Sequence, residues 1–209
     1  MGAGAPVLNY ASGVRITIDG NSVAKGQGAV ESHWDAQMIN RAPFNGNAPI
    51  INIAQDGWTI TNMIASGSSA DATFDPTKKN ILIAWEGNNE IDNLGKTPQQ
   101  AIDKMTQYCA ERLAVHPWLI VMATNIPKTT DAVINGKHIV YDNLLKANYR
   151  AMGAKICIDF ASVGGAFAFD YTNSANFGLY QADTVHPNPT GNFELAKIFA
   201  AALRRVPKR

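Results

Sequence analysis

Short apolar runs alternate with amphipathic segments along the chain, and this alternation strongly restricts the folds it can adopt. Strands that are apolar along their whole length are typical of a parallel sheet covered by helices on both faces. The sequence therefore predicts an α/β fold, a three-layer α/β/α sandwich with a five-stranded parallel sheet. The runs with the composition of buried strands lie at about residues 14–18, 49–53, 80–85, 118–122 and 154–160. Helical patterns lie at about residues 32–41, 58–66, 141–152 and 190–204, and a further helix begins at the capping box Thr97-Pro98-Gln99-Gln100.

Length and composition indicate one domain. The chain has 209 residues, of which 46% are hydrophobic, enough for one well-buried core and hardly enough for two. We therefore expect residues 1–209 to form a single domain. Nothing in the sequence specifies its oligomeric state.

Charge and the amino terminus argue against several classes of protein. The formal net charge of +1 provides no basic face for nucleic acid. The first ten residues, MGAGAPVLNY, lack the basic, apolar and small-residue order of a signal peptide. No run approaches the roughly 18 apolar residues of a membrane span. We expect a protein of the cytoplasm or of a virion, or a domain excised from a larger protein.

Four polar clusters occupy positions where an α/β protein binds its ligand. The sequence DGNS follows the first predicted strand, QDGW at 55–58 follows the second, and EGNNE at 86–90 follows the third. The fourth cluster, ADTVHPNPTGN at 182–192, precedes the last predicted helix. The carboxyl ends of parallel strands lie at one edge of the sheet, which is where ligands bind. We expect the four clusters to meet there.

Two of these clusters supply the parts of a nucleophilic relay. A serine hydroxyl is a weak nucleophile and needs a base to take its proton as it attacks. Asp183 and His186 stand three residues apart, so the carboxylate can hold one ring nitrogen while the other faces the cleft. Pro187 and Pro189 stiffen this segment. We predict Ser22 as nucleophile, His186 as base and Asp183 as the residue that orients His186.

Attack on an ester carbonyl creates an oxyanion, which needs hydrogen-bond donors aimed at it. The predicted donors are the main-chain N–H groups of Ser22 and Gly57 and the side-chain amide of Asn89. Taken singly, Gly57 and Asn89 are also common turn residues. Their significance depends on their place beside a serine and a base.

With these residues in place, the chain resembles the SGNH hydrolases, also called GDSL-type esterases and lipases. Ser22, Gly57, Asn89 and His186 match the Ser, Gly, Asn and His of four family blocks in the same order, and Asp183 matches the acidic residue of the D-x-x-H block. The resemblance spans nearly the whole chain. It implies a flavodoxin-like α/β/α fold and ester hydrolysis through an acyl-enzyme, without a metal or other cofactor.

The chain departs from the family pattern at two positions. The usual Gly-Asp-Ser is Gly20-Asn21-Ser22 here, and the usual Gly-x-Asn-Asp ends in Glu90. The D-G-N-S form resembles esterase domains of bacteriophage tail proteins. This resemblance implies O-acetyl esters of carbohydrate as substrate, either small molecules or polysaccharides.

Other functions stay open at this point. The chain could be a lipase or lysophospholipase-type member that acts on longer acyl chains. It could also be a catalytically inactive carbohydrate-binding domain on the same fold. The aromatic residues that could then stack on sugars are Trp34, Trp58, Trp85 and Tyr180.

Two further classes fit the sequence less well. A flavodoxin-like nucleotide binder could use Gly20, Gly26 and Gly28, but neither phosphate-binding glycine motif is present. A metallohydrolase would need more convergent ligands than the scattered histidines provide, which are His33, His116 and His138.

Overall fold

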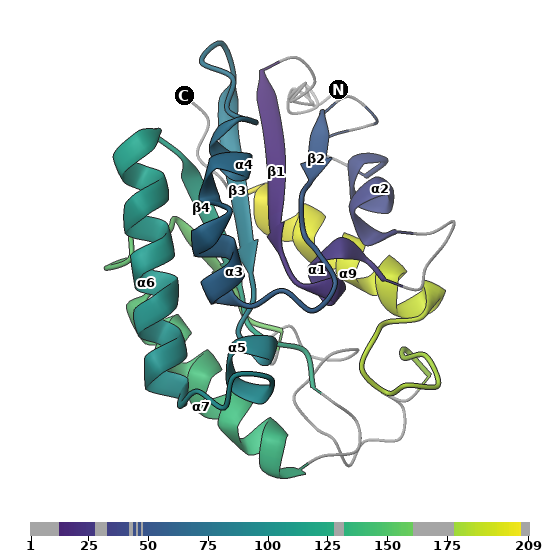
Figure 1. Cartoon of the computed structure of the whole chain (residues 1–209). Helices are drawn as coiled ribbons and strands as arrows, with labels where there is room; N and C mark the ends of the chain where they lie inside the picture. Colours follow the sequence, from purple (N-terminus) through teal and green to yellow (C-terminus); the bar gives the residue numbers. More distant parts are fainter. Residues whose placement is uncertain are drawn as a thin grey trace, which may run out of the picture.

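The computed structural model describes residues 13–27, 33–41, 44, 46, 48–127, 132–160 and 178–205. Its centre is a parallel five-stranded sheet with the strand order β2-β1-β3-β4-β5 (Figure 1). The predicted α/β fold and parallel sheet are confirmed. The strands are β1 (Val14–Gly20), β2 (Ile50–Asn52), β3 (Lys79–Trp85), β4 (Leu119–Ala123) and β5 (Ile156–Ile158).

Helices cover both faces of this sheet. On one face lie α2 (Trp34–Ile39) and α9 (Pro189–Leu203). On the other lie α3 (Ile60–Ala65), α4 (Gly67–Asp71), α6 (Pro98–Val115) and α7 (Ala132–Asn148). Two short helices, α1 (Ser22–Lys25) and α5 (Asn88–Asp92), begin just beyond the carboxyl ends of β1 and β3.

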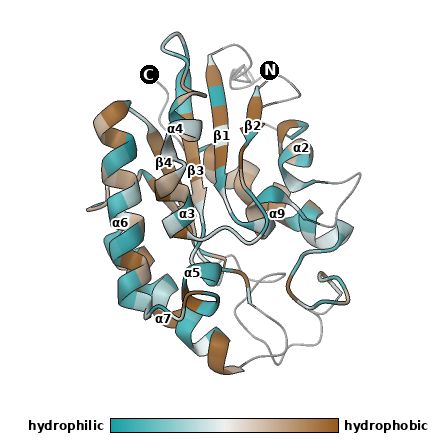
Figure 2. Ribbon diagram, viewed as in Figure 1, coloured by the Kyte–Doolittle hydropathy of each residue, from teal (hydrophilic) through white to brown (hydrophobic). Residues whose placement is uncertain are grey.

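Alternate side chains of the strands enter two separate cores. On the first face, Ile16 and Ile83 pack with Trp34 and Phe199. On the second face, the buried side chains of β3 and β4 pack with those of α3, α6 and α7. Both faces of the central strands are therefore buried, which explains their hydrophobic stretches in Figure 2.

The strand order places a switch point between β1 and β3. From β1 the chain adds β2 on one side, and the later strands follow β3 on the other side. In sheets of this kind the connections leave in opposite directions at the switch point, which opens a crevice at the carboxyl ends of the two strands. The segments that follow β1 and β3 flank this crevice.

Some helix boundaries differ from the sequence expectation. The helix α7 begins at Ala132, well before the predicted residue 141. The sequence pattern missed its first part because two of the buried positions there hold polar residues, Asn135 and His138, which interrupt the apolar period. The helices α1, α4 and α5 were not predicted; each is one turn or slightly longer, too short to show an apolar period. Residue 32 of the predicted helix 32–41 and Gly28 lie outside the described residues.

The carboxyl end of β1 contains a buried carboxyl group. Asp19 is 1% exposed and accepts a hydrogen bond from the hydroxyl of Tyr108 on α6, at 2.6 Å. Burial raises the pKa of Asp19 to about 6, although the hydrogen bond from Tyr108 acts in the opposite direction. The folded protein therefore holds this proton more tightly than the unfolded chain does.

This raised pKa makes stability depend on pH. The contribution of Asp19 to the free energy of unfolding is present at about pH 4 and is lost as the pH rises through about 6. The reason is that the Asp19 carboxyl loses its proton at a lower pH in the unfolded chain than in the folded protein. Asp19→Asn, whose amide oxygen can still accept from Tyr108, should reduce the fall in the free energy of unfolding over this range by on the order of 2 kcal/mol. Denaturant unfolding at a series of pH values measures this, with the exposed α6 variant Asp103→Asn as the control. An unchanged pH dependence in Asp19→Asn would contradict the assignment.

Candidate active site

Ser22 lies at the start of the short helix α1, directly beyond the first strand. The side chain of Asn21 caps this helix, because its Oδ1 accepts from the N–H groups of Val23 at 2.9 Å and Ala24 at 3.3 Å. As the first residue of the helix, Ser22 has an N–H that takes no part in the hydrogen bonds of the helix. The turn therefore presents both a hydroxyl and an N–H at the carboxyl edge of the sheet.

The structure brings Ser22, His186 and Asp183 together. The Oγ of Ser22 lies 2.8 Å from Nε2 of His186, and Nδ1 of His186 lies 2.6 Å from Oδ2 of Asp183. The other oxygen of Asp183 accepts from the N–H groups of Val185 at 2.9 Å and His186 at 3.0 Å. A carboxylate can only accept, so Nδ1 of His186 carries the proton and Nε2 is left to accept from Ser22.

The environment of Asp183 keeps it charged. Burial acts to raise its pKa, but the hydrogen bonds from His186 and from the main chain of Val185 together outweigh burial, so the pKa lies below its ordinary value. The side chain is 45% exposed, and water can reach it. A charged Asp183 holds the ring of His186 in one tautomer.

A strained turn carries Asp183 and His186. Among the described residues, Thr184 is the one non-glycine residue with a positive φ, 61°. The turn is closed by hydrogen bonds from the N–H of Gln181 to His186 O and from the N–H of Thr184 to Gln181 O, at 2.8 and 3.0 Å. The side chain of Gln181 also donates to the carbonyl of Gln27 at 3.0 Å. This last bond fastens the histidine turn to the segment that follows Ser22.

Gly57 lies in the loop between β2 and α3, and Asn89 lies in α5; these two segments are joined to each other and to β1. The side-chain nitrogen of Asn89 donates to the carbonyl of Trp58 at 2.9 Å, and the N–H of Gln55 donates to the carbonyl of Gly20 at 3.1 Å. An amide nitrogen carries two hydrogens, so Asn89 has a second one to offer. Gly57 has a φ of 74° and is exposed, and a Cβ there would meet no atom within 4 Å.

Two acidic residues that the sequence prediction did not use hold these loops in place. Glu86 is 1% exposed and accepts from the side-chain nitrogen of Asn21 and from the N–H of Glu90, the latter at 2.9 Å. Burial raises the pKa of Glu86 to about 8, against the effect of its hydrogen bonds. Glu90 in turn accepts from the N–H and the hydroxyl of Thr61 at 3.0 and 2.9 Å. The two departures from the family pattern, Asn21 and Glu90, both take part in this network.

Within the described residues, the other three histidines take no part in the series from Ser22 through His186 to Asp183. His33 lies beside Gly26, the C-cap residue of α1. His138 is fully buried, with Nε2 3.1 Å from Oδ1 of Asp92, and His116 stacks on Phe74 with ring centroids 4.2 Å apart. No group of three or more His, Cys, Asp or Glu side chains in the described ranges could hold a metal ion. Within the same ranges, no helix has the length and apolar character needed to cross a membrane.

Three of the four aromatic residues that the sequence offers for sugar stacking are part of the core. Trp34 and Trp85 are 0% and 3% exposed, and Tyr180 is 6% exposed. Trp58 is partly exposed and lies next to Gly57. Only Trp58 of the four is therefore placed to touch a ligand.

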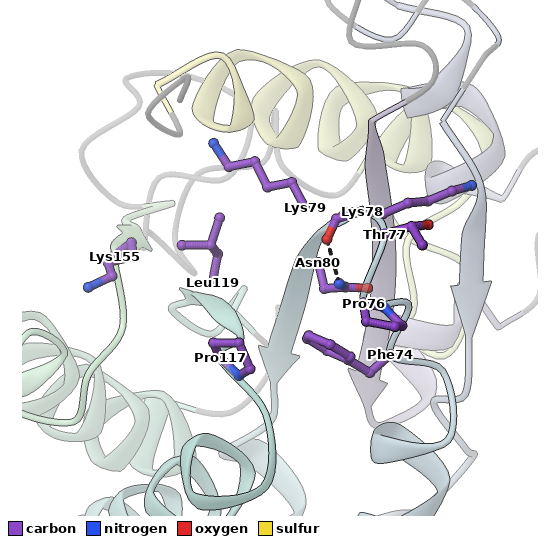
Figure 3. Close-up of a pocket in the computed structure, with 9 residues that line it drawn as sticks. All are labelled: Phe74, Pro76, Thr77, Lys78, Lys79, Asn80, Pro117, Leu119 and Lys155. Atoms are coloured by element: carbon purple, nitrogen blue, oxygen red, sulfur yellow. Dashed lines mark hydrogen bonds between the residues drawn. The ribbon is translucent and has the colours of Figure 1, made fainter.

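A cavity of about 700 Å³ lies elsewhere, at the opposite edge of the sheet where β3 and β4 begin (Figure 3). Among the described residues that line it there is no serine, histidine or carboxylate, which are the groups that ester hydrolysis by a serine relay requires. The residues that line it are Phe74, Pro76, Thr77, Lys78, Lys79, Asn80, Pro117, Leu119 and Lys155.

Comparison with known proteins places the fold. No protein-family model and no curated protein sequence matches the chain. A lipolytic protein of the G-D-S-L family from Veillonella parvula is similar in structure, with a TM-score of 0.72 and 18% identity over 92% of this chain and 100% of that one. A variant of an acetyl-xylooligosaccharide esterase from Geobacillus has a TM-score of 0.69 and 15% identity, over 97% of this chain and 100% of that one.

A third solved structure agrees with these two. It is described as a putative SGNH hydrolase from Slackia heliotrinireducens, and has a TM-score of 0.66 and 16% identity over 92% of this chain and 100% of that one. At such identities the likeness concerns the fold. The chain has the fold of the SGNH and GDSL-type hydrolases.

Proposed function

We propose that this protein is a serine esterase that removes short acyl groups, O-acetyl groups of carbohydrate in particular, through an acyl-enzyme. The observation that carries the proposal is the continuous hydrogen-bonded series from Ser22 Oγ through His186 to Asp183, with distances of 2.8 and 2.6 Å. This series lies at the switch point of the sheet, where α/β proteins bind ligands.

The reaction follows from the roles of these groups. The Oγ of Ser22 attacks the ester carbonyl while Nε2 of His186 takes its proton, and Asp183 stabilises the resulting imidazolium. The N–H groups of Ser22 and Gly57 and the amide of Asn89 donate to the oxyanion. His186 then protonates the departing alkoxide. Water attacks the acyl-enzyme with His186 again as base, which releases the acid and restores Ser22.

Two observations support a short acyl group on a polar substrate. The rim of the site is polar: Lys25 and Asp56 form an exposed ion pair at 2.8 Å beside Gly57, and Gln55 is also exposed. One of the solved structures with this fold is an acetyl-xylooligosaccharide esterase. The inactive carbohydrate-binding alternative is disfavoured, because the proposed triad is fully hydrogen-bonded and three of its four candidate stacking residues are buried.

The serine mechanism predicts which residue a fluorophosphonate labels. Wild-type protein should react at Ser22 and lose esterase activity, and Ser22→Ala should have neither label nor activity. Activity should survive EDTA, because His186 and not a metal activates the nucleophile. Ser69→Ala, which removes an exposed hydroxyl on α4, is the control and should behave as wild type. Activity that EDTA abolishes and zinc restores would refute the mechanism.

Asn89 should affect the rate far more than the fold. Asn89→Ala removes one oxyanion donor and should lower kcat/KM by roughly a hundredfold or more. It also removes the hydrogen bond to Trp58, worth about 1 kcal/mol, so the melting temperature should change only modestly. The exposed variant Asn93→Ala, just after α5, serves as the control. If Asn89→Ala kept full activity, the oxyanion donors would be misassigned.

Acyl-chain length separates a deacetylase from a lipase-type enzyme. In an apolar groove each buried methylene would contribute about 0.8 kcal/mol, nearly fourfold in kcat/KM. Because the described rim is polar, p-nitrophenyl acetate should be cleaved faster than the butyrate, and the octanoate hardly at all. A kcat/KM that increases steadily from acetate to octanoate would favour the lipase-type alternative.

A further inference from the structure

Asn21 and Glu86 form a buried pair directly behind Ser22. They are 3% and 1% exposed, and the side-chain nitrogen of Asn21 donates to Oε2 of Glu86. The direction of this bond is fixed, because Oδ1 of Asn21 already accepts from two N–H groups of α1 and Oε1 of Glu86 accepts from the N–H of Glu90. Each side chain thus forms hydrogen bonds with its own turn through one atom and with the opposite turn through another atom.

We propose that this pair is the device that positions the nucleophile against the oxyanion donor Asn89, and that Glu86 is the reason why residue 21 must be an amide. This inference rests on the proposed esterase function. It assigns Asn21 and Glu86 as positioning residues, since neither is argued to touch the substrate.

The pair acts on both sides of the crevice. Asn21 precedes Ser22 and caps its helix, so the orientation of the amide sets the orientation of the turn that carries Oγ. On the other side, the Glu86 carboxyl accepts a hydrogen bond from the N–H of Glu90 at 2.9 Å, and the main chain of Gly87 and Asn89 acts to lower its pKa. The carboxyl therefore faces the start of α5, which carries the Asn89 amide. The bond between Asn21 and Glu86 joins the two turns.

The groups that surround Glu86 explain why a second carboxyl at position 21 would be unfavourable. The groups that face it are the amide of Asn21, the main chain at the start of α5, and Tyr141 of α7, whose hydroxyl donates to Glu86 O at 2.8 Å. None of these described groups is a cation. A carboxyl at position 21 would have to share a proton with Glu86, as two adjoining buried carboxyls do, and the two would repel once that proton is lost.

Exchanging the two groups provides a direct test. Asn21→Asp alone places two carboxyls in contact, although it creates the Gly-Asp-Ser sequence usual in the family that the chain resembles. Glu86→Gln alone places two amide nitrogens in contact or leaves the N–H of Glu90 unpaired. In the double variant the amide at position 86 donates to the carboxylate at position 21, which still caps α1. The hydrogen bonds from Val23, Ala24 and Glu90 are kept, and only the direction of the bond between residues 21 and 86 is reversed.

The measurement is kcat and KM on p-nitrophenyl acetate, with active sites counted by fluorophosphonate so that misfolded protein does not contribute. Each single variant should lower kcat by about tenfold or more with little change in KM, and the double variant should recover it to within about threefold. Relative to wild type at the same pH, Asn21→Asp should lose more activity at about pH 9 than at about pH 6, because the shared proton is lost.

Asn21→Ser covers the case in which a single variant fails to fold. Serine caps a helix about as well as asparagine, so α1 should still form. It cannot reach Glu86, so the melting temperature should fall by no more than the loss of one buried hydrogen bond explains, while kcat falls. Wild-type kcat per active site in Asn21→Asp or Asn21→Ser would overturn the proposal. So would a double variant whose loss equals the product of the two single losses. If the wild-type protein had no esterase activity, the proposed function itself would be refuted. An active wild-type enzyme in which the two single losses multiply would refute only the positioning role of Asn21 and Glu86.

Discussion

The parallel pairing of β1 with β3 is the constraint on which the rest of the site depends. Their register places Gly20 opposite Trp85, so the chain leaves both strands at the same level. The approach is close, since a Cβ on Gly20 would lie 2.2 Å from the carbonyl oxygen of Trp85. Only glycine fits there, and the turns that carry Ser22 and Glu86 are consequently neighbours. The contact between Asn21 and Glu86 is possible because of this register.

Two sets of hydrogen bonds hold the candidate site together where the chain leaves β1 and β3. Hydrogen bonds of the Asn21–Glu86 pair and of Glu90 hold the nucleophile turn and α5, the helix that carries Asn89, on the side away from the histidine turn. The histidine turn approaches from the outside and is fastened by the side chain of Gln181. Asn21, Glu86 and Glu90 are buried and hydrogen-bonded, whereas Asp183 of the histidine turn is partly exposed, as a substrate entrance requires.

Much of this arrangement could be predicted from the sequence, because it follows from periodicity and topology. Apolar runs located the five strands, and the rule that ligands bind at their carboxyl ends placed Ser22 near His186. The short helices α1 and α5 were missed because their extent depends on caps and not on an apolar period. Glu86 was missed for a related reason: an acidic residue after a strand usually faces water, and only the tertiary structure shows that it is buried against Asn21.

Trapping the acyl-enzyme is the most direct test of the proposed mechanism. Wild-type protein is mixed with p-nitrophenyl acetate, quenched in acid within the first turnover, and analysed by intact mass and peptide mapping. We predict one added acetyl group, on Ser22, which forms before free acetate accumulates and is absent from Ser22→Ala. Rapid ester hydrolysis with no acetyl group on Ser22, or with the acetyl group on another residue, would contradict the serine mechanism.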